Sequence, residues 1–150
     1  MASGRIHARV AGMIAVGATL ATPLIAAQYS VDIALGIAGG AWSGYLVTPD
    51  IDIPHRTHEE WRIIRRLPII GRLWTAWWAA YGQLFTHRGI SHAPIIGTVT
   101  RIAYALWPLA LLPITALYPF RYMVAAAFVA WCVQDIVHLI ADGWRWRWTI

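Results

Sequence analysis

Long apolar stretches with few charged residues dominate this sequence and constrain its fold more than any other feature. Four can be distinguished, at about residues 10–27, 33–47, 95–120 and 122–142. Hydrophobic residues make up 59% of the 150-residue chain and charged residues 13%, against about 25% charged in a typical soluble domain. A helix of about 20 apolar residues spans the hydrocarbon core of a bilayer. We therefore predict an all-α fold, a four-helix transmembrane bundle that forms a single domain.

The region between the second and third stretches, about residues 59–85, alternates arginine with tryptophan and other aromatic residues. This combination suits the headgroup zone of an anionic leaflet, so we predict an interfacial helical segment with the lipid bilayer as its partner. Packing over the bundle is an equally good interpretation. Aromatic and arginine side chains also bind nucleic acid, but beside four apolar spans we expect lipid and no nucleic acid.

The positions of the arginines predict an orientation in the membrane. Two precede the first stretch, and two follow the fourth. Seven, the last of them Arg101, fall between the second stretch and the uncharged run of the third, which starts at residue 102, and only Arg121 lies on the other side. The positive-inside rule then places both termini and the central loop in the cytoplasm of a bacterial inner-membrane protein. A cleaved signal peptide with Arg5 and Arg9 as its basic region is the alternative, and Pro23 within the run argues against it.

Three glycines spaced four residues apart, Gly36, Gly40 and Gly44, form a smooth face on the second predicted helix. Such a face lets another helix backbone approach closely. We favour packing within one copy of the chain, and a seam between two copies of a homo-oligomer is the alternative.

Two carboxylates, Asp50 and Asp52, follow the second apolar stretch and are flanked by prolines. Prolines disfavour helix, so we expect an extended segment in which residues two apart share a face and can point at one metal ion. A polar turn that closes the second helix is the alternative. His55 and His58 follow and are either additional ligands or surface histidines of a basic loop.

A second polar cluster, His-Arg-Gly-Ile-Ser-His, runs from His87 to His92 just before the third stretch. Its glycine permits an unusual backbone that lets both imidazoles converge. Arg88 carries a permanent positive charge suited to a phosphate or carboxylate group. Ser91 is predicted either to cap the third helix or to orient a ligand.

The third cluster, Asp135, His138 and Asp142, lies late in the fourth stretch on one helical face. His138 and Asp142 are one turn apart and can bind the same ion, while Asp135 lies deeper and is expected to orient His138. Ionisable groups in an apolar helix are costly unless paired or used, which favours a metal or proton role. The predicted topology places all three clusters at the cytoplasmic face.

These motifs carry a resemblance to known families. Asp-x-Asp, His-Arg-Gly-x-Ser-His and His-x-x-x-Asp within four apolar helices resemble the YdjM-like (LexA-regulated) membrane-bound metal-dependent hydrolases. They resemble more closely an allied family of bacterial membrane proteins described as metal-binding. The resemblance runs from the second helix to the end of the fourth. That hydrolase family is similar in turn to the all-helical zinc-dependent phospholipases C and single-strand nucleases, whose further ligands this chain lacks unless His55, His58 and Asp135 supply them.

The residues predict a metal centre. The expected ligands are His87, His92, His138 and Asp142. Either Asp50 or Asp52 is expected to complete the shell or to act as general base. Zinc is the preferred divalent metal for mixed imidazole and carboxylate ligands, with manganese or iron as alternatives. The expected function is metal-dependent hydrolysis of an anionic phosphoester or similar substrate, with Arg88 stabilising negative charge. A non-catalytic metal-stabilised membrane protein and a small ion or proton transporter are the alternatives.

The predicted orientation can be tested by cysteine-accessibility labelling in intact cells, after the single native Cys132 is replaced. A cysteine at Glu59 should be protected from an impermeant reagent, whereas one between Ala116 and Arg121 should react, because only the latter segment is predicted to face outward. Labelling at Glu59 from outside would show the orientation to be wrong.

Overall fold

The computed structural model describes residues 4–53, 57, 61, 64–108 and 113–143. Within these residues the chain is helical and contains no strand. The elements in chain order are α1 (Gly4–Gln28), α2 (Val31–Leu46), the 3-10 helix η1 (Pro49–Asp52), α4 (Pro68–Leu84), the 3-10 helix η2 (Ile90–His92), α5 (Ile96–Leu106), the 3-10 helix η4 (Ile114–Phe120) and α6 (Arg121–Ala141).

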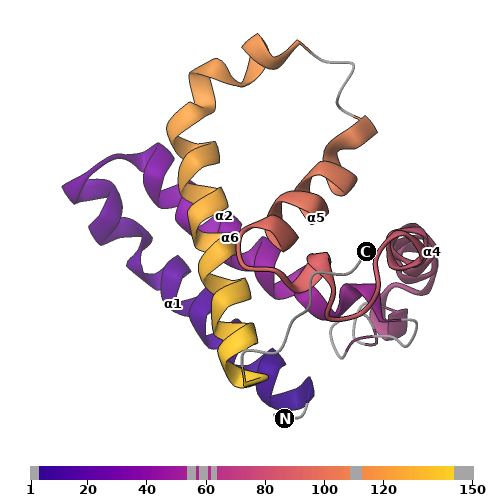
Figure 1. The fold of residues 1–150 in the computed structure, drawn as a ribbon. Helices are drawn as coiled ribbons and strands as arrows, with labels where there is room; N and C mark the ends of the chain where they lie inside the picture. The colour runs from indigo at the N-terminus through magenta and orange to yellow at the C-terminus, as the bar shows by residue number, and fades with distance from the viewer. Residues whose placement is uncertain (1–3, 54–56, 58–60, 62–63, 109–112, 144–150) are drawn as a thin grey trace.

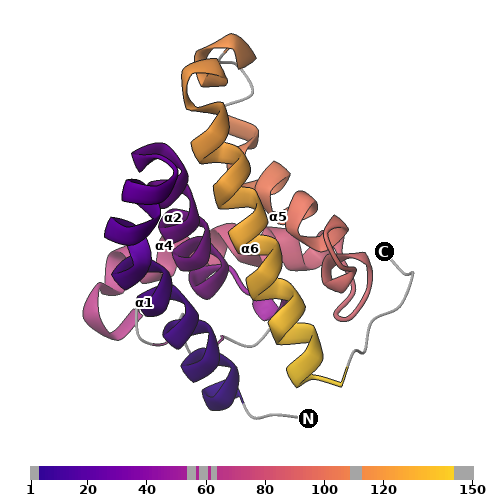
Figure 2. The same cartoon turned by 90° about the vertical axis from the view of Figure 1, so that its left-hand side faces the viewer.

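Helix α2 packs along its length against both α1 and α6 (Figure 2). A short turn joins α1 to α2, where the Ser30 hydroxyl accepts a hydrogen bond from the Ile33 N–H at 3.2 Å and caps α2. The side-chain amide of Gln134 on α6 donates to the carbonyl oxygens of Ala11 on α1 and Ala41 on α2, at 2.9 and 3.0 Å. One buried polar side chain therefore ties the three helices together.

The glycine face of α2 packs directly on the backbone of α6. A Cβ atom added at Gly40 would lie 2.0 Å from the carbonyl oxygen of Ala127, and one added at Gly36 would lie 2.3 Å from that of Met123. Only residues without a side chain permit so close an approach. The interpretation of this face as packing within one copy of the chain is confirmed.

Helix α4 lies across the end of α2 and beside η1 (Figure 1). Its residues Trp78 and Tyr81 join Val47 and Ile51 in a buried core cluster. The hydroxyl of Tyr104 on α5 donates to the carbonyl oxygen of Trp77 at 2.6 Å, which links α4 to α5. This face of the predicted interfacial segment therefore packs over the bundle, as one of the two interpretations expects. In the part of the segment before α4, residues 59, 60, 62 and 63 lie outside the described residues.

Within the part of the chain that the structure describes, two helices are long and apolar enough to cross a membrane by length and composition. They are Gly4–Gln28, with a mean hydropathy of 1.9, and Thr115–Ala141, with a mean hydropathy of 1.8. Helix α2 has 16 residues and α5 has 11, so the predicted four-span bundle is not confirmed. The expectation of one helix over 95–120 is wrong, because α5 ends at Leu106, just before two prolines that interrupt helical hydrogen bonding.

The close approach of α2 and α6 leads to a prediction with a matched control. Replacement of Gly40 by alanine should lower the free energy of unfolding by about 1–3 kcal/mol, because the new methyl group would overlap α6 backbone atoms. Replacement of Gly39 by alanine should leave stability unchanged or raise it by up to about 1 kcal/mol, since nothing lies within 4 Å of its added Cβ. Thermal unfolding of both variants in the same detergent measures the difference, and equal melting temperatures would contradict it.

Candidate metal centre

The three polar clusters meet at one end of the helical bundle. This end is formed by the beginning of α1, the end of α6 and two short helices (Figure 1). Of these, η1 follows α2 and η2 precedes α5. The site therefore draws its side chains from segments that are far apart in the sequence.

The carboxylate of Asp50 lies at the centre of the cluster. Its Oδ1 atom is 3.4 Å from Nε2 of His92 and 3.4 Å from Nε2 of His138, and its Oδ2 atom is 3.9 Å from Nδ1 of His7. Burial alone would raise the pKa of Asp50, but the contacts with these three imidazoles outweigh burial and hold the pKa well below its usual range. A carboxylate that stays ionised among imidazoles attracts a cation.

The second carboxylate, Asp52, faces two imidazoles from the other side. Its oxygens lie 2.9 Å from Nδ1 of His87 and 3.3 Å from Nδ1 of His92, and it accepts a hydrogen bond from the Ser91 hydroxyl. Burial would raise the pKa of Asp52, but these contacts lower it to about 2. The expectation that both carboxylates lie in an extended segment is wrong, because Pro49–Asp52 forms a 3-10 helix with a proline at its start, where its missing N–H is tolerated.

The imidazole of His92 lies between the two carboxylates and is 1% exposed. Burial would lower the pKa of His92, but its contacts with Asp50 and Asp52 outweigh that effect and raise it. The same pair of negative charges that favours a proton on this ring would also favour a metal ion close to it.

Asp142 and Arg88 complete this end of the molecule. Asp142 lies 3.5 Å from Nε2 of His7 and 3.9 Å from Nε2 of His138, and a terminal nitrogen of Arg88 lies 3.8 Å from Asp142. The backbone of Arg88, not of Gly89, adopts the left-handed conformation, with φ of 63°. This turn directs the Arg88 N–H to Nδ1 of His92 at 3.3 Å.

Sequence reasoning missed His7, which the structure places in the cluster. The ring of His7 stacks obliquely on that of His138, with centroids 4.3 Å apart, and it is buried. The sequence did hold a signal for this position of His7. The residue lies just before the first apolar stretch, on the side of the membrane where the predicted topology places the other polar clusters. The neighbouring Arg5 and Arg9 point away from the cluster and remain exposed.

The structure gives Asp135 partners other than the one expected. The carboxylate pairs with Arg101 and accepts a hydrogen bond from Thr98, both on α5. The expectation that Asp135 orients His138 is therefore not met. The assignment of Arg101 to the charged cytoplasmic loop is wrong. Its side chain is fully buried between α5 and α6, where it pairs with Asp135.

Arg101 also holds the backbone of η2. Its Nη1 atom donates to the carbonyl oxygen of Ser91 at 2.6 Å. The Ser91 hydroxyl binds Asp52 and does not cap α5, where no side-chain cap is present. A chain of contacts thus runs from Asp135 through Arg101 and Ser91 to Asp52. His55 and His58 lie outside the described residues.

The donor set fits a divalent metal ion. The residues His7, Asp50 and His138 have ligand atoms within 4.8 Å of one another, and so do Asp50, His87 and His92. Four ligands about 2.1 Å from a tetrahedral zinc ion lie roughly 3.4 Å apart. The 3.4 Å separations between Asp50 and two imidazole nitrogens match this spacing and are longer than a good hydrogen bond.

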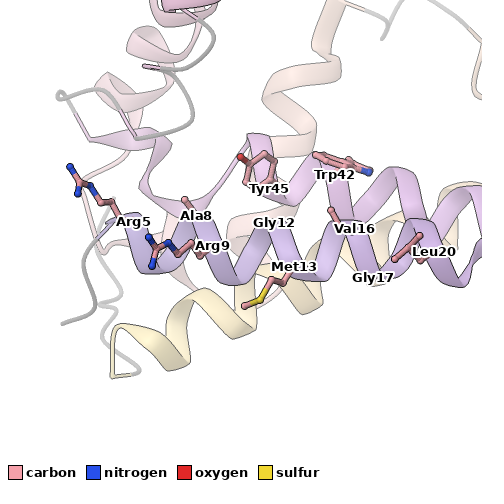
Figure 3. A pocket seen from close by; sticks show the side chains of 10 residues that line it. All are labelled: Arg5, Ala8, Arg9, Gly12, Met13, Val16, Gly17, Leu20, Trp42 and Tyr45. Carbon is pink, nitrogen blue, oxygen red and sulfur yellow. The ribbon is translucent and has the colours of Figure 1, made fainter.

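A groove on the outer surface of α1 and α2 begins beside this end of the molecule. Figure 3 shows Arg5 and Arg9 at one end of it, Trp42 and Tyr45 along one wall and Leu20 at the far end. Its volume is about 820 Å³. Its basic end and mainly apolar length are distinct from the buried cluster.

The described residues are helical, and the cluster is a candidate metal centre of mixed imidazole and carboxylate donors. Residues 2–145 match the model of the family described as "Uncharacterized metal-binding protein (DUF2227)", and the chain belongs to that family of metal-binding proteins. No curated protein and no solved structure matches the chain. The expected membership of a metal-binding family is confirmed, whereas no link to the YdjM-like hydrolases is found.

The buried pair of Asp135 and Arg101 generates a stability prediction. Replacement of Asp135 by asparagine should cost about 3–5 kcal/mol, because it would leave the Arg101 charge buried without a counter-charge. Replacement of the exposed Asp32 by asparagine is the matched control and should change stability by less than about 0.5 kcal/mol. Denaturation in detergent measures both variants, and similar stability of the two would contradict the importance of the pair.

Proposed function

We propose that this protein binds a divalent metal ion, preferably zinc, at the Asp50 cluster and uses it to hydrolyse a phosphoester or similar bond at the cytoplasmic face of a membrane. The observation that carries the proposal is the position of Asp50, an ionised carboxylate facing imidazoles from α1, η2 and α6. When bound, such an ion activates water for attack at neutral pH.

The cluster is partly open to solvent, which a substrate requires. The side chain of Asp50 is 22% exposed and that of His87 is 35% exposed, whereas Asp52 and His92 are buried. A water molecule or an anionic group can therefore approach the side formed by Asp50 and His87. This open edge favours a hydrolase over a closed structural site.

The residues of the cluster divide into three roles. Asp50 and the imidazoles of His92 and His138 supply ligand atoms, with His7, His87 and Asp142 next to them. Asp52 holds the Nδ1 side of two imidazoles and so sets the direction in which their remaining nitrogens point. Arg88, whose guanidinium is permanently charged and has no lone pair, stabilises an anionic substrate group.

We propose that the protein is embedded in a membrane. The outer face of α1 exposes large apolar side chains such as Met13, Leu20 and Leu24, which are 66%, 74% and 76% exposed. Lipid tails would cover these side chains, and the arginines at the basic end of the groove would lie near anionic headgroups. With the termini in the cytoplasm, as the arginine distribution predicts, the metal centre faces the cytoplasmic leaflet.

The second candidate is a metal that only stabilises the fold. It is supported by the origin of the ligand candidates, because an ion held by α1, η1, η2 and α6 would cross-link segments distant in the chain. The proton-relay alternative has less support, since Asp135 is paired with Arg101 and Thr98.

Metal content and turnover of single variants test the proposed roles. Alanine at His92 or His138 should weaken metal binding at least tenfold and lower the metal content of the purified protein, because each removes an imidazole next to Asp50. Alanine at Arg88 should keep the metal and lower the hydrolysis of a phosphodiester by about 10²-fold or more, as does loss of a charge-stabilising donor elsewhere.

Elemental analysis and a phosphodiester assay on the same detergent-purified samples give both readouts, with Asp32→Asn as the control. Full metal occupancy in the His92 and His138 variants would contradict the ligand assignment. Normal metal behaviour without turnover of any ester would instead support the metal-stabilised alternative.

A further inference from the structure

The imidazoles of the centre form two pairs, one on each side of Asp50. The rings of His7 and His138 have centroids 4.3 Å apart, and those of His87 and His92 have centroids 4.7 Å apart. Between the pairs, the rings of His92 and His138 are 6.3 Å apart. The first pair joins α1 to α6 and is a product of the tertiary fold, whereas both rings of the second pair come from one short motif.

Asp50 is the residue that the two pairs share. Among the described residues, the two groups with ligand atoms within 4.8 Å of one another have only Asp50 in common. Its Oδ1 atom lies 3.4 Å from a nitrogen of each pair. A carboxylate has two oxygens and about four lone-pair sites, so it can serve two cations at once.

A single ion does not account for this arrangement. A tetrahedral zinc ion takes four ligands, whereas four imidazoles and three carboxylates gather at this site. Each pair also has its own carboxylate, Asp142 beside His7 and His138, and Asp52 beside His87 and His92.

We propose that the centre binds two divalent cations, with Asp50 as their shared ligand. The first ion is held by His7, His138 and Asp50, and the second by His87, His92 and Asp50. This inference rests on the proposed metal-binding function of the Asp50 cluster. Paired ions about 3.5–4 Å apart are suited to phosphoester substrates, because both the attacking and the leaving oxygen can be stabilised.

The test is the number of metal ions per chain in protein purified without a polyhistidine tag and equilibrated with zinc. The wild-type protein should saturate at two ions per chain. His7→Ala and His87→Ala should each retain about one ion, because each variant removes a ligand from only one group. Asp50→Asn should fall towards zero, because it weakens both groups, and the exposed-site control Asp32→Asn should keep two.

A second measurement on the wild-type protein does not depend on the folding of any variant. Loading with Mn²⁺ should give an electron paramagnetic resonance spectrum with exchange coupling between two ions, which isolated Mn²⁺ does not show. Saturation of the wild type at one ion, with an uncoupled spectrum, would overturn the two-ion proposal and leave a single-metal centre intact. Absence of bound metal from the wild type would overturn both the two-ion proposal and the proposed function.

Discussion

The close contact between α2 and α6 determines how the rest of this molecule is assembled. Because Gly36 and Gly40 have no side chains, the two backbones meet at distances that a Cβ atom would prevent. This contact sets the position of α6 along α2, and with it the position of His138 beside the carboxylate that follows α2. The geometry of the metal centre thus depends on a packing contact that involves no metal ligand.

Buried charge is the second constraint on this end of the molecule. Asp52, Arg101 and Asp135 are all removed from solvent, and each has opposite charges or hydrogen-bond donors and acceptors around it. Because unpaired charges would be strongly destabilising in such surroundings, these contacts restrict the conformations that η2 can adopt. The Arg101 contact to the Ser91 carbonyl oxygen carries this restriction to the residues that face Asp52.

The metal centre could be predicted in outline because short motifs bring chemistry-bearing residues together locally. The spacing of His138 and Asp142 places both on one helical face whatever the tertiary structure. The segment from His87 to His92 is only six residues long, so its two imidazoles lie close together. The role of His7 could not be predicted in the same way, because it has no ligand-type neighbour in the sequence. Only the packing of α1 against α2 and α6 brings it to Asp142.

The sequence by itself determined that the chain is helical, that long apolar segments separate its polar clusters, and that these clusters contain metal-type donors. These properties follow from local patterns of residues, which act through propensity, helical periodicity and solvation. The tertiary structure alone decided that Arg101 is buried against Asp135 and that Asp50 rather than Asp52 lies among three imidazoles. Each of these depends on contacts between segments distant in the chain, for which a single sequence holds no local signal.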